Sequence, residues 1–358
     1  MRITTSSSIK KMLLLFLVFA GLYYAKEFLM PISIGAVIAT LFLPFCRWME
    51  SKKIPRSLAA LFCLSIILMV IFFVGYIIGW QISSFANDLA LIKQKAIEKV
   101  GLIQLYIFDH LGIAMEKQSQ ILKTEQPSVT SIMQLVIGSV KYIFINCILV
   151  LAYIFLLLYY RKHIKQFMLK LTPSNERAEM DQIIYSTTHV TQQYLLGLAK
   201  MIALLWVMYS IGFGIIGVQN FIFFAILCGI LEIVPFIGNI TGTIFTVLIA
   251  AINGAGLPLL AGIVVVYGIV QFIQGWLLEP LILGPQVKIN PLFTIIALIL
   301  GEILWGIPGV ILAIPITAMF KITCDHIESL KPFGFLIGEI ESEKPKKNLI
   351  KRVRELFK

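Results

Sequence analysis

Residues 221–254 read FIFFAILCGILEIVPFIGNITGTIFTVLIAAING, and this stretch decides the fold. It is almost continuously apolar over 34 residues, more than the roughly 20 that one transmembrane helix needs. Polar and helix-breaking residues interrupt it only in the middle, at Glu232, Pro235, Gly238 and Asn239. One helix cannot continue through this break, because proline lacks an amide hydrogen and clashes with the preceding turn. We therefore expect a re-entrant hairpin, whose two helical arms meet near the middle of the membrane.

Residues 291–320 repeat the arrangement. An apolar arm over 292–300 precedes a break that contains Glu302, Pro308 and Gly309, and a second arm follows to residue 320. Apolar runs at 198–218 and 257–277 precede the two hairpins, so the two units form an inverted repeat whose hairpins enter from opposite sides. Interrupted hydrophobic segments at matching positions of two halves are typical of a transporter's binding site. The alternative is a pair of proline kinks in two long, tilted helices.

The composition sets the class of protein. Of 358 residues, 59% are hydrophobic and only 14% are charged, against roughly 25% charged in an average soluble domain. This composition predicts a polytopic membrane protein and excludes a soluble enzyme, a nucleic-acid binder and a secreted disulfide scaffold. The net charge of +11 does not indicate a nucleic-acid partner, because the basic residues lie in the gaps between apolar runs.

Four further apolar runs, at 12–25, 28–46, 57–80 and 132–160, complete the predicted fold class. It is an all-α polytopic membrane protein with about six spanning helices plus two re-entrant hairpins in an inverted repeat. A cleaved signal peptide is the alternative for residues 1–25, but Tyr23 and Tyr24 occupy the place where small residues precede a cleavage site. Residues 81–131 mix both charges with apolar residues at helical spacing, which predicts an extracytoplasmic amphipathic helical insertion.

These features divide the chain into six regions. They are the first three transmembrane helices as a scaffold (1–80), the insertion (81–131), a fourth transmembrane helix with a polar cytoplasmic helix (132–195), a transmembrane helix with the first hairpin (196–254), a transmembrane helix with the second hairpin (255–322), and a basic cytoplasmic tail (323–358).

The distribution of basic residues predicts the orientation. In this topology 23 Lys and Arg residues fall on one side of the membrane and 6 on the other. Positively charged segments near short loops stay in the cytoplasm. We therefore expect both termini of this multi-pass protein to be cytoplasmic.

Ionisable side chains inside a membrane are costly, so each is a candidate functional group. Glu232 lies one turn before Pro235, and Glu302 lies in the expected break of the second hairpin; either carboxyl could carry a proton or bind a cation. Structural pairing, with Lys141 or Lys200 in the case of Glu232, is the alternative. Glu279, beside Pro280, is either a coupling residue or an interfacial one.

Amide side chains add to this set. Gln271 and Gln274 are spaced i, i+3 on one face of the helix 257–277, and with Asn239 they either line a solute path or join helices. Five scattered cysteines show no metal-ligand spacing, and no phosphate-binding loop or hydrolase motif occurs. We expect no enzyme, no cofactor and no resident metal, only a transient monovalent cation at Glu232.

Longer motifs carry a family resemblance. The stretches GILEIVPFIG at 229–238, EPLILGP at 279–285, NPL at 290–292 and GIPGVILAIP at 306–315 resemble the motifs of the autoinducer-2 exporter family of bacterial membrane permeases. The resemblance covers nearly the whole chain and is most specific in its C-terminal third. The chain departs from the family pattern at Asn290, where His precedes proline in the family, and at Glu302, where a second glycine is usual.

This resemblance implies a secondary transporter of the bacterial inner (cytoplasmic) membrane, assembled as a homo-oligomer such as a pentamer. Three functions stay open. The first is a permease that exports a small polar solute such as autoinducer-2, with or without cation or proton coupling. The second is a sodium(lithium)/proton antiporter, and the third is a non-transporting membrane scaffold or regulator. In the first two, we expect the hairpins and their paired helices to move against residues 1–195.

Overall fold

A computed structural model describes residues 5–87, 129–234, 237–283 and 288–339, together with 94, 98, 101, 104–110, 112–114 and 117. Secondary structure in these ranges is helical apart from one isolated bridge between Ile289 and Gly338, which confirms the all-α prediction. The helices are α1 (Thr5–Tyr24), α2 (Lys26–Ser51), α3 (Arg56–Asn87), α6 (Val129–Leu171), α7 (Arg177–Ile215), α8 (Phe221–Leu231), α9 (Ile237–Ile252), α10 (Leu257–Ile273), the π-helix η1 (Gln274–Leu283), α12 (Pro291–Trp305), α13 (Ile307–His326), the 3-10 helix η2 (Glu328–Leu330) and α14 (Lys331–Ile337).

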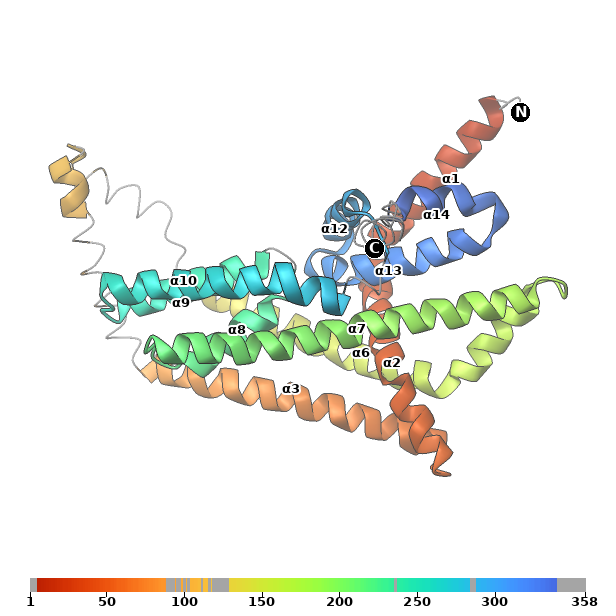
Figure 1. The fold of residues 1–358 in the computed structure, drawn as a ribbon, viewed down its shortest axis with the longest axis horizontal. Helices are drawn as coiled ribbons and strands as arrows, with labels where there is room; N and C mark the ends of the chain where they lie inside the picture. Colours follow the sequence, from red (N-terminus) through yellow and green to blue (C-terminus); the bar gives the residue numbers. More distant parts are fainter. Residues whose placement is uncertain are drawn as a thin grey trace, which may run out of the picture.

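The long helices α3, α7 and α10 run along the longest axis of the molecule, and α8 and α9 lie beside them (Figure 1). The C-terminal helices α12, α13 and α14 lie together above the middle and right part of α7 in this view, and α1 projects away from the body. The apolar side chains along α1 are largely exposed, as suits a helix surrounded by lipid rather than water.

Six helices in the described part are long and apolar enough to cross a membrane, which agrees with the predicted number. They cover Lys26–Ser51, Arg56–Ile77, Ile145–Leu171, Arg177–Ile215, Leu257–Ile282 and Ile307–His326. The set of helices that are long enough to span differs from the predicted set. The first apolar run lies in α1, whose apolar part, Met12–Tyr24, is shorter than a membrane span. In contrast α13, expected as one arm of a hairpin, has spanning length.

One expected boundary is wrong. A polar helix to about residue 193 and a separate crossing over 198–218 were expected, but α7 is a single helix of 39 residues. The intervening residues contain no proline, and the buried Gly197 is tolerated inside the helix at a cost of about 1 kcal/mol. The helix therefore runs without interruption across residues 195 and 196. In the same way α6 continues past Arg161 to Leu171.

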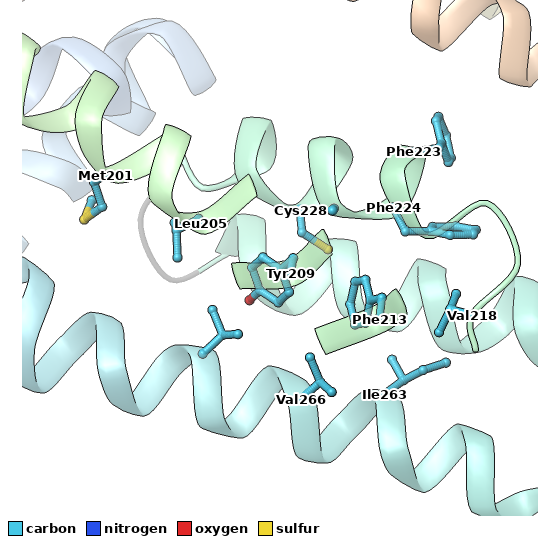
Figure 2. Packing of buried hydrophobic residues seen from close by; sticks show 12 residues of the cluster. Met201, Leu205, Tyr209, Phe213, Val218, Phe223, Phe224, Cys228, Ile263 and Val266 are labelled. Carbon is cyan, nitrogen blue, oxygen red and sulfur yellow. The ribbon is translucent and has the colours of Figure 1, made fainter. Parts of the chain in front are cut away.

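The described residues form three clusters of buried side chains, and the two larger ones hold the long helices together. In the first, Met201, Leu205, Tyr209 and Phe213 recur every four residues along one face of α7 and pack between α8 and α10 (Figure 2). This spacing places successive side chains one above the other on a helix. The partners from α8 and α10 include Phe224, Cys228, Ile263, Val266 and Val270.

The second cluster joins α2, α3 and α6. Small and medium side chains, Ala59, Ala60 and Cys63 of α3 among them, let the three helices approach closely. An ion pair reinforces it: Arg161 Nη2 of α6 lies 2.5 Å from Glu50 Oε1 of α2, and both side chains are largely buried.

The helices α12 and α13 form the second expected hairpin, but its break is shorter than predicted. Gly301 and Glu302 lie within α12, which continues to Trp305. The chain reverses at Gly306, whose φ of 64° favours glycine. A Cβ on Gly301 or Gly309 would overlap the backbone of the other, so these glycines set the distance between the arms.

The C-terminal segment and the polar insertion are described only in part. Residues 323–326 of the expected tail still belong to α13. α14 packs against α13, and its C-terminal end bonds to the residues that precede α12. There Asn290 Oδ1 accepts from Phe293 N at 3.0 Å, and its amide donates to the carbonyls of Leu336 and Gly338. Residues 340–358 lie outside the described residues. Of the predicted insertion 81–131, residues 81–87 extend α3 and 104–110 are helical; most of the rest lies outside the described part.

Candidate functional site

The first hairpin brings Glu232 to the end of α8. The arms are antiparallel, since Gly242 of α9 faces Cys228 of α8 and the rings of Phe224 and Phe245 lie 6.3 Å apart. α8 ends at Leu231 and α9 begins at Ile237, so Glu232 lies in the segment that joins the two arms. Pro235, a predicted site residue, lies outside the described residues.

Gly238 allows the tip to close. It is buried in the first turn of α9, and a Cβ built there would overlap the carbonyl group of Leu231. The overlapping atoms are backbone, which cannot rotate away. The predicted site residue Gly238 is therefore a spacing residue, whose lack of a side chain holds Glu232 close to α9.

A widened helix presents the amide side chains to this tip. α10 changes at Gln274 into the π-helix η1, which runs to Leu283 and contains Pro280. Residues 278–280, just beyond the expected end of the helix 257–277, are therefore helical as well. Proline cannot donate to the preceding turn and would clash with it in an α-helix, and a wider turn relieves that clash. Single π turns inside α-helices often occur at functional sites.

Four predicted polar residues meet here, which confirms none of their roles but places them together. Gln274 Nε2 donates to Glu232 Oε1 at 2.5 Å, and Gln274 Oε1 accepts from Asn239 Nδ2 at 3.4 Å and from Gln271 Nε2 at 3.2 Å. Glu232, Asn239 and Gln274 are 6%, 2% and 2% exposed. Gln274 is thus the centre of a buried network that joins α9, α10 and the tip of the hairpin.

The network extends to α7 through Tyr209, which sequence reasoning missed. Its hydroxyl donates to Asn239 Oδ1 at 3.5 Å, and its ring is fully buried in the first cluster. Tyr209 falls on the apolar stripe of α7, so its pattern is that of a core aromatic residue. The signal that could have found it is a hydroxyl on a helix that faces a polar break.

Two buried oxygens of this region lack a hydrogen-bond partner in the described part of the chain. They are Glu232 Oε2 and Thr243 Oγ1, the latter on α9 one turn beyond Asn239. Buried polar atoms in native proteins nearly always have a partner. An unpartnered carboxylate oxygen beside amide and hydroxyl groups is suited to a proton, a hard monovalent cation or a hydrogen-bonding solute.

Glu279 borders this network, and the other predicted residues lie apart from it. Glu279 is an exposed residue of η1 whose carboxylate interacts with the amide of Gln274. Glu302 is exposed on α12, so the expectation that it occupies the break of the second hairpin is wrong. Pro308 begins α13, and Gly309 packs against Gly301.

The chemistry of the described residues is that of binding rather than of a metal centre. No group of three or more His, Cys, Asp or Glu residues in the described ranges could hold a metal ion. The side chains of the buried network offer carboxylate, amide and phenol groups instead.

The chain is similar to known transport proteins along most of its length. A family model described as AI-2E family transporter matches residues 12–329. The chain is 26% identical to YrrI of Bacillus subtilis over 84% of its length and 87% of that protein, and 29% identical to YueF of the same organism over 81% and 82%. It is 21% identical to YhhT of Escherichia coli K12 over 92% and 93%. All three are described only as candidate transport proteins.

Proposed function

Because this chain belongs to the AI-2E transporter family, we propose that it is a secondary permease for a small polar solute, coupled to a proton or a monovalent cation at Glu232. The observation that carries the proposal is the buried carboxyl between the hairpin tip and the π-helix, with one oxygen held by Gln274 and the other without a partner. The multi-pass membrane fold and the family support transport in general. Autoinducer-2 is the substrate suggested by the family's name.

The physical argument for coupling begins with the cost of a buried charge. An isolated carboxylate in an apolar environment is strongly unfavourable, so it is stable only when it is protonated or when a cation or a donor group compensates it. At Glu232, the Gln274 amide compensates one oxygen. Binding of a proton or a cation at Oε2 would compensate the second, and solute binding that depends on this state would be coupled to the ion.

The two packing clusters support a division between moving and static parts. One cluster joins α7, α8 and α10, and the other joins α2, α3 and α6. We propose that the first cluster, with both hairpins, moves against the second, and that the hairpins are re-entrant halves of an inverted repeat. A cross-link between α8 and α3, which touch each other, should then stop transport.

The length of α13 makes the second hairpin the sharper test of this topology. A 20-residue helix can span the membrane, whereas α12 has only 15 residues. In the proposed topology both termini are cytoplasmic, the protein lies in the inner membrane, and α12 and α13 enter and leave on the cytoplasmic side. Single cysteines near residues 290 and 326, probed with an impermeant thiol reagent in cells, should both be protected from the outside. Labelling of one of them would refute the re-entrant arrangement.

A sodium(lithium)/proton antiporter is the second candidate. The specific observation in its favour is that the unpartnered group is a hard carboxylate oxygen, in a network that also contains the amide oxygens of Asn239 and Gln274. Sodium and lithium prefer such oxygen ligands, as other hard cations do. This function needs no solute site, so an exchange of sodium for protons without solute would distinguish it from the permease.

Flux in proteoliposomes tests these proposals together. Purified protein is reconstituted and exposed to a panel of small polar solutes, autoinducer-2 included, with and without sodium, lithium and pH gradients. The permease predicts solute flux that is lost in Glu232→Gln and kept in Glu302→Gln, the matched exposed carboxyl. Flux unaffected by Glu232→Gln would refute coupling at this site. If the wild type, Glu232→Gln and Pro235→Ala all show no flux above protein-free vesicles, a non-transporting scaffold or regulator is favoured. Under each of these functions we propose a homo-oligomer, such as a pentamer, as the working form.

A further inference from the structure

A cavity of about 360 Å³ lies where the first turn of α3 meets α6, far in sequence from the Glu232 network. It is lined by Pro55, Arg56, Ser57, Tyr159, Tyr160 and His163. The lining therefore combines a guanidinium, an imidazole and three hydroxyl groups. None of these six residues is acidic, so the cavity favours an anion.

Neighbouring charges reinforce this preference. Lys52 and Lys53 precede α3, and Lys162 follows Tyr160 within α6; all three are exposed. The acidic residue nearest in sequence is Glu50, whose carboxylate is paired with Arg161 at 2.5 Å. The exposed lysines therefore leave the local electrostatic potential positive. The positive end of the α3 dipole adds to this field.

The position of the cavity identifies the ligand as a lipid. Arg56 begins one candidate membrane span, and Tyr160 lies inside another, directly before the basic residues Arg161, Lys162 and Lys165. Tyrosine and arginine at this depth are typical of the boundary between headgroups and hydrocarbon. Tyr159 and Tyr160 are 40% and 50% exposed, and their rings are T-shaped at 4.9 Å.

An apolar surface continues from the cavity into the membrane. One helical turn beyond Ser57, Leu61 is 46% exposed, and one turn before Tyr160, Leu156 is 44% exposed. Residues four apart share a face of a helix, so both leucines extend the two walls of the cavity toward the hydrocarbon. A phosphate in the cavity would therefore have its acyl chains on these leucines.

We propose that this cavity is a binding site for the headgroup of an anionic phospholipid of the cytoplasmic leaflet. Arg56 binds the phosphate as a charged donor, the His163 ring and the Ser57 hydroxyl donate hydrogen bonds, and the two tyrosines contact the glycerol region. Basic pockets between transmembrane helices on the cytoplasmic side bind anionic headgroups in this way. The site lies beside the second packing cluster and does not depend on the proposed transport function.

Native mass spectrometry of the full-length protein tests the proposal. The protein in detergent is titrated with dioleoyl phosphatidylglycerol and, in parallel, with dioleoyl phosphatidylcholine. We expect phosphatidylglycerol to bind more tightly, and Arg56→Gln to weaken it about fivefold, the contribution of one basic residue near an anionic surface. Phosphatidylcholine binding should not change. Lys170→Gln, an exposed charge on the same helix α6 outside the cavity, is the matched control and should change affinity by less than about twofold.

His163→Gln is the second variant and should weaken phosphatidylglycerol binding while the protein elutes and melts as the wild type does. The proposal is overturned if Arg56→Gln and His163→Gln both bind as the wild type, or if Lys170→Gln loses as much affinity as Arg56→Gln, which would indicate surface charge alone. Inorganic phosphate is the third arm. If millimolar inorganic phosphate displaces phosphatidylglycerol, and phosphatidylglycerol then binds no more tightly than phosphatidylcholine, the cavity binds free phosphate and the lipid assignment is wrong.

Discussion

Replacement of Gly238 by alanine should disrupt the hairpin tip, although a glycine-to-alanine substitution within a helix usually stabilises the helix. Alanine is the better helix former by about 1 kcal/mol, and Gly238 lies within α9. A Cβ at this position would, however, overlap the carbonyl group of Leu231 and approach the amide nitrogen of Glu232. Real Cβ atoms essentially never approach other atoms within 3.0 Å, so the two arms must separate by on the order of 1 Å.

This separation sets the magnitude of the effect. Overpacking that displaces backbone costs typically about 1–3 kcal/mol, which for a chain of 358 residues corresponds to a thermal midpoint lowered by about 1–4 °C. Because Glu232 is in the displaced segment, its 2.5 Å hydrogen bond with Gln274 should lengthen and transport should fall more than tenfold, as about 1 Å of misplacement does in preorganised sites.

The assay compares Gly238→Ala with Gly268→Ala, a glycine inside α10 where a Cβ meets no atom within 4 Å. Thermal unfolding is followed in detergent, and flux is measured in proteoliposomes. The control should be neutral or slightly stabilised and fully active. If Gly238→Ala behaves like the control in both assays, the close approach at the tip has no functional importance and the reasoning is refuted.

Four other substitutions test three separate parts of the structure. Thr243→Val removes a buried hydroxyl without a partner and should raise stability by about 1 kcal/mol, while transport is lost if that hydroxyl binds the cargo. Thr246→Val removes a hydrogen bond to Gly242 O at 2.8 Å and should lower stability by a similar amount. Equal thermal shifts of the two variants would contradict this. Asn290→Ala removes the N-cap of α12 and both hydrogen bonds to the end of α14, so faster hydrogen exchange is expected in 331–339, and unchanged exchange would show that this link is not needed. Glu50→Gln leaves the largely buried Arg161 without its carboxylate and should destabilise the protein by about 2 kcal/mol, measured by thermal unfolding, whereas an unchanged midpoint would make the pair dispensable.

The sequence was sufficient to predict the components of the candidate site. Glu232, Asn239, Gln271 and Gln274 are polar residues in apolar segments, and the cost of burying them unpaired predicts that they find one another. Their meeting requires only that the break in 221–254 faces the polar face of the helix 257–277. The breaks in both segments follow from proline and glycine, whose backbone preferences are local.

What the sequence could not predict depends on tertiary packing. Gly301 and Glu302 were expected to interrupt a helix, yet α12 continues through them because Gly301 packs on Gly309 and needs no turn. Tyr209 has the spacing of a core residue, and only the approach of α9 turns its hydroxyl into a partner of Asn239. The π-helix likewise depends on how η1 packs against α7, in addition to Pro280.

The central claim is that Glu232 carries the coupling ion, and ion-jump currents from proteoliposomes on a solid-supported membrane measure it most directly. Rapid jumps of sodium, lithium or proton concentration are applied to the wild type, to Glu232→Gln and to Glu302→Gln. The account predicts a current for at least one ion, absent in Glu232→Gln and preserved in Glu302→Gln, because only the first carboxyl is buried in the network. A current that persists in Glu232→Gln, or that disappears equally in Glu302→Gln, would contradict it.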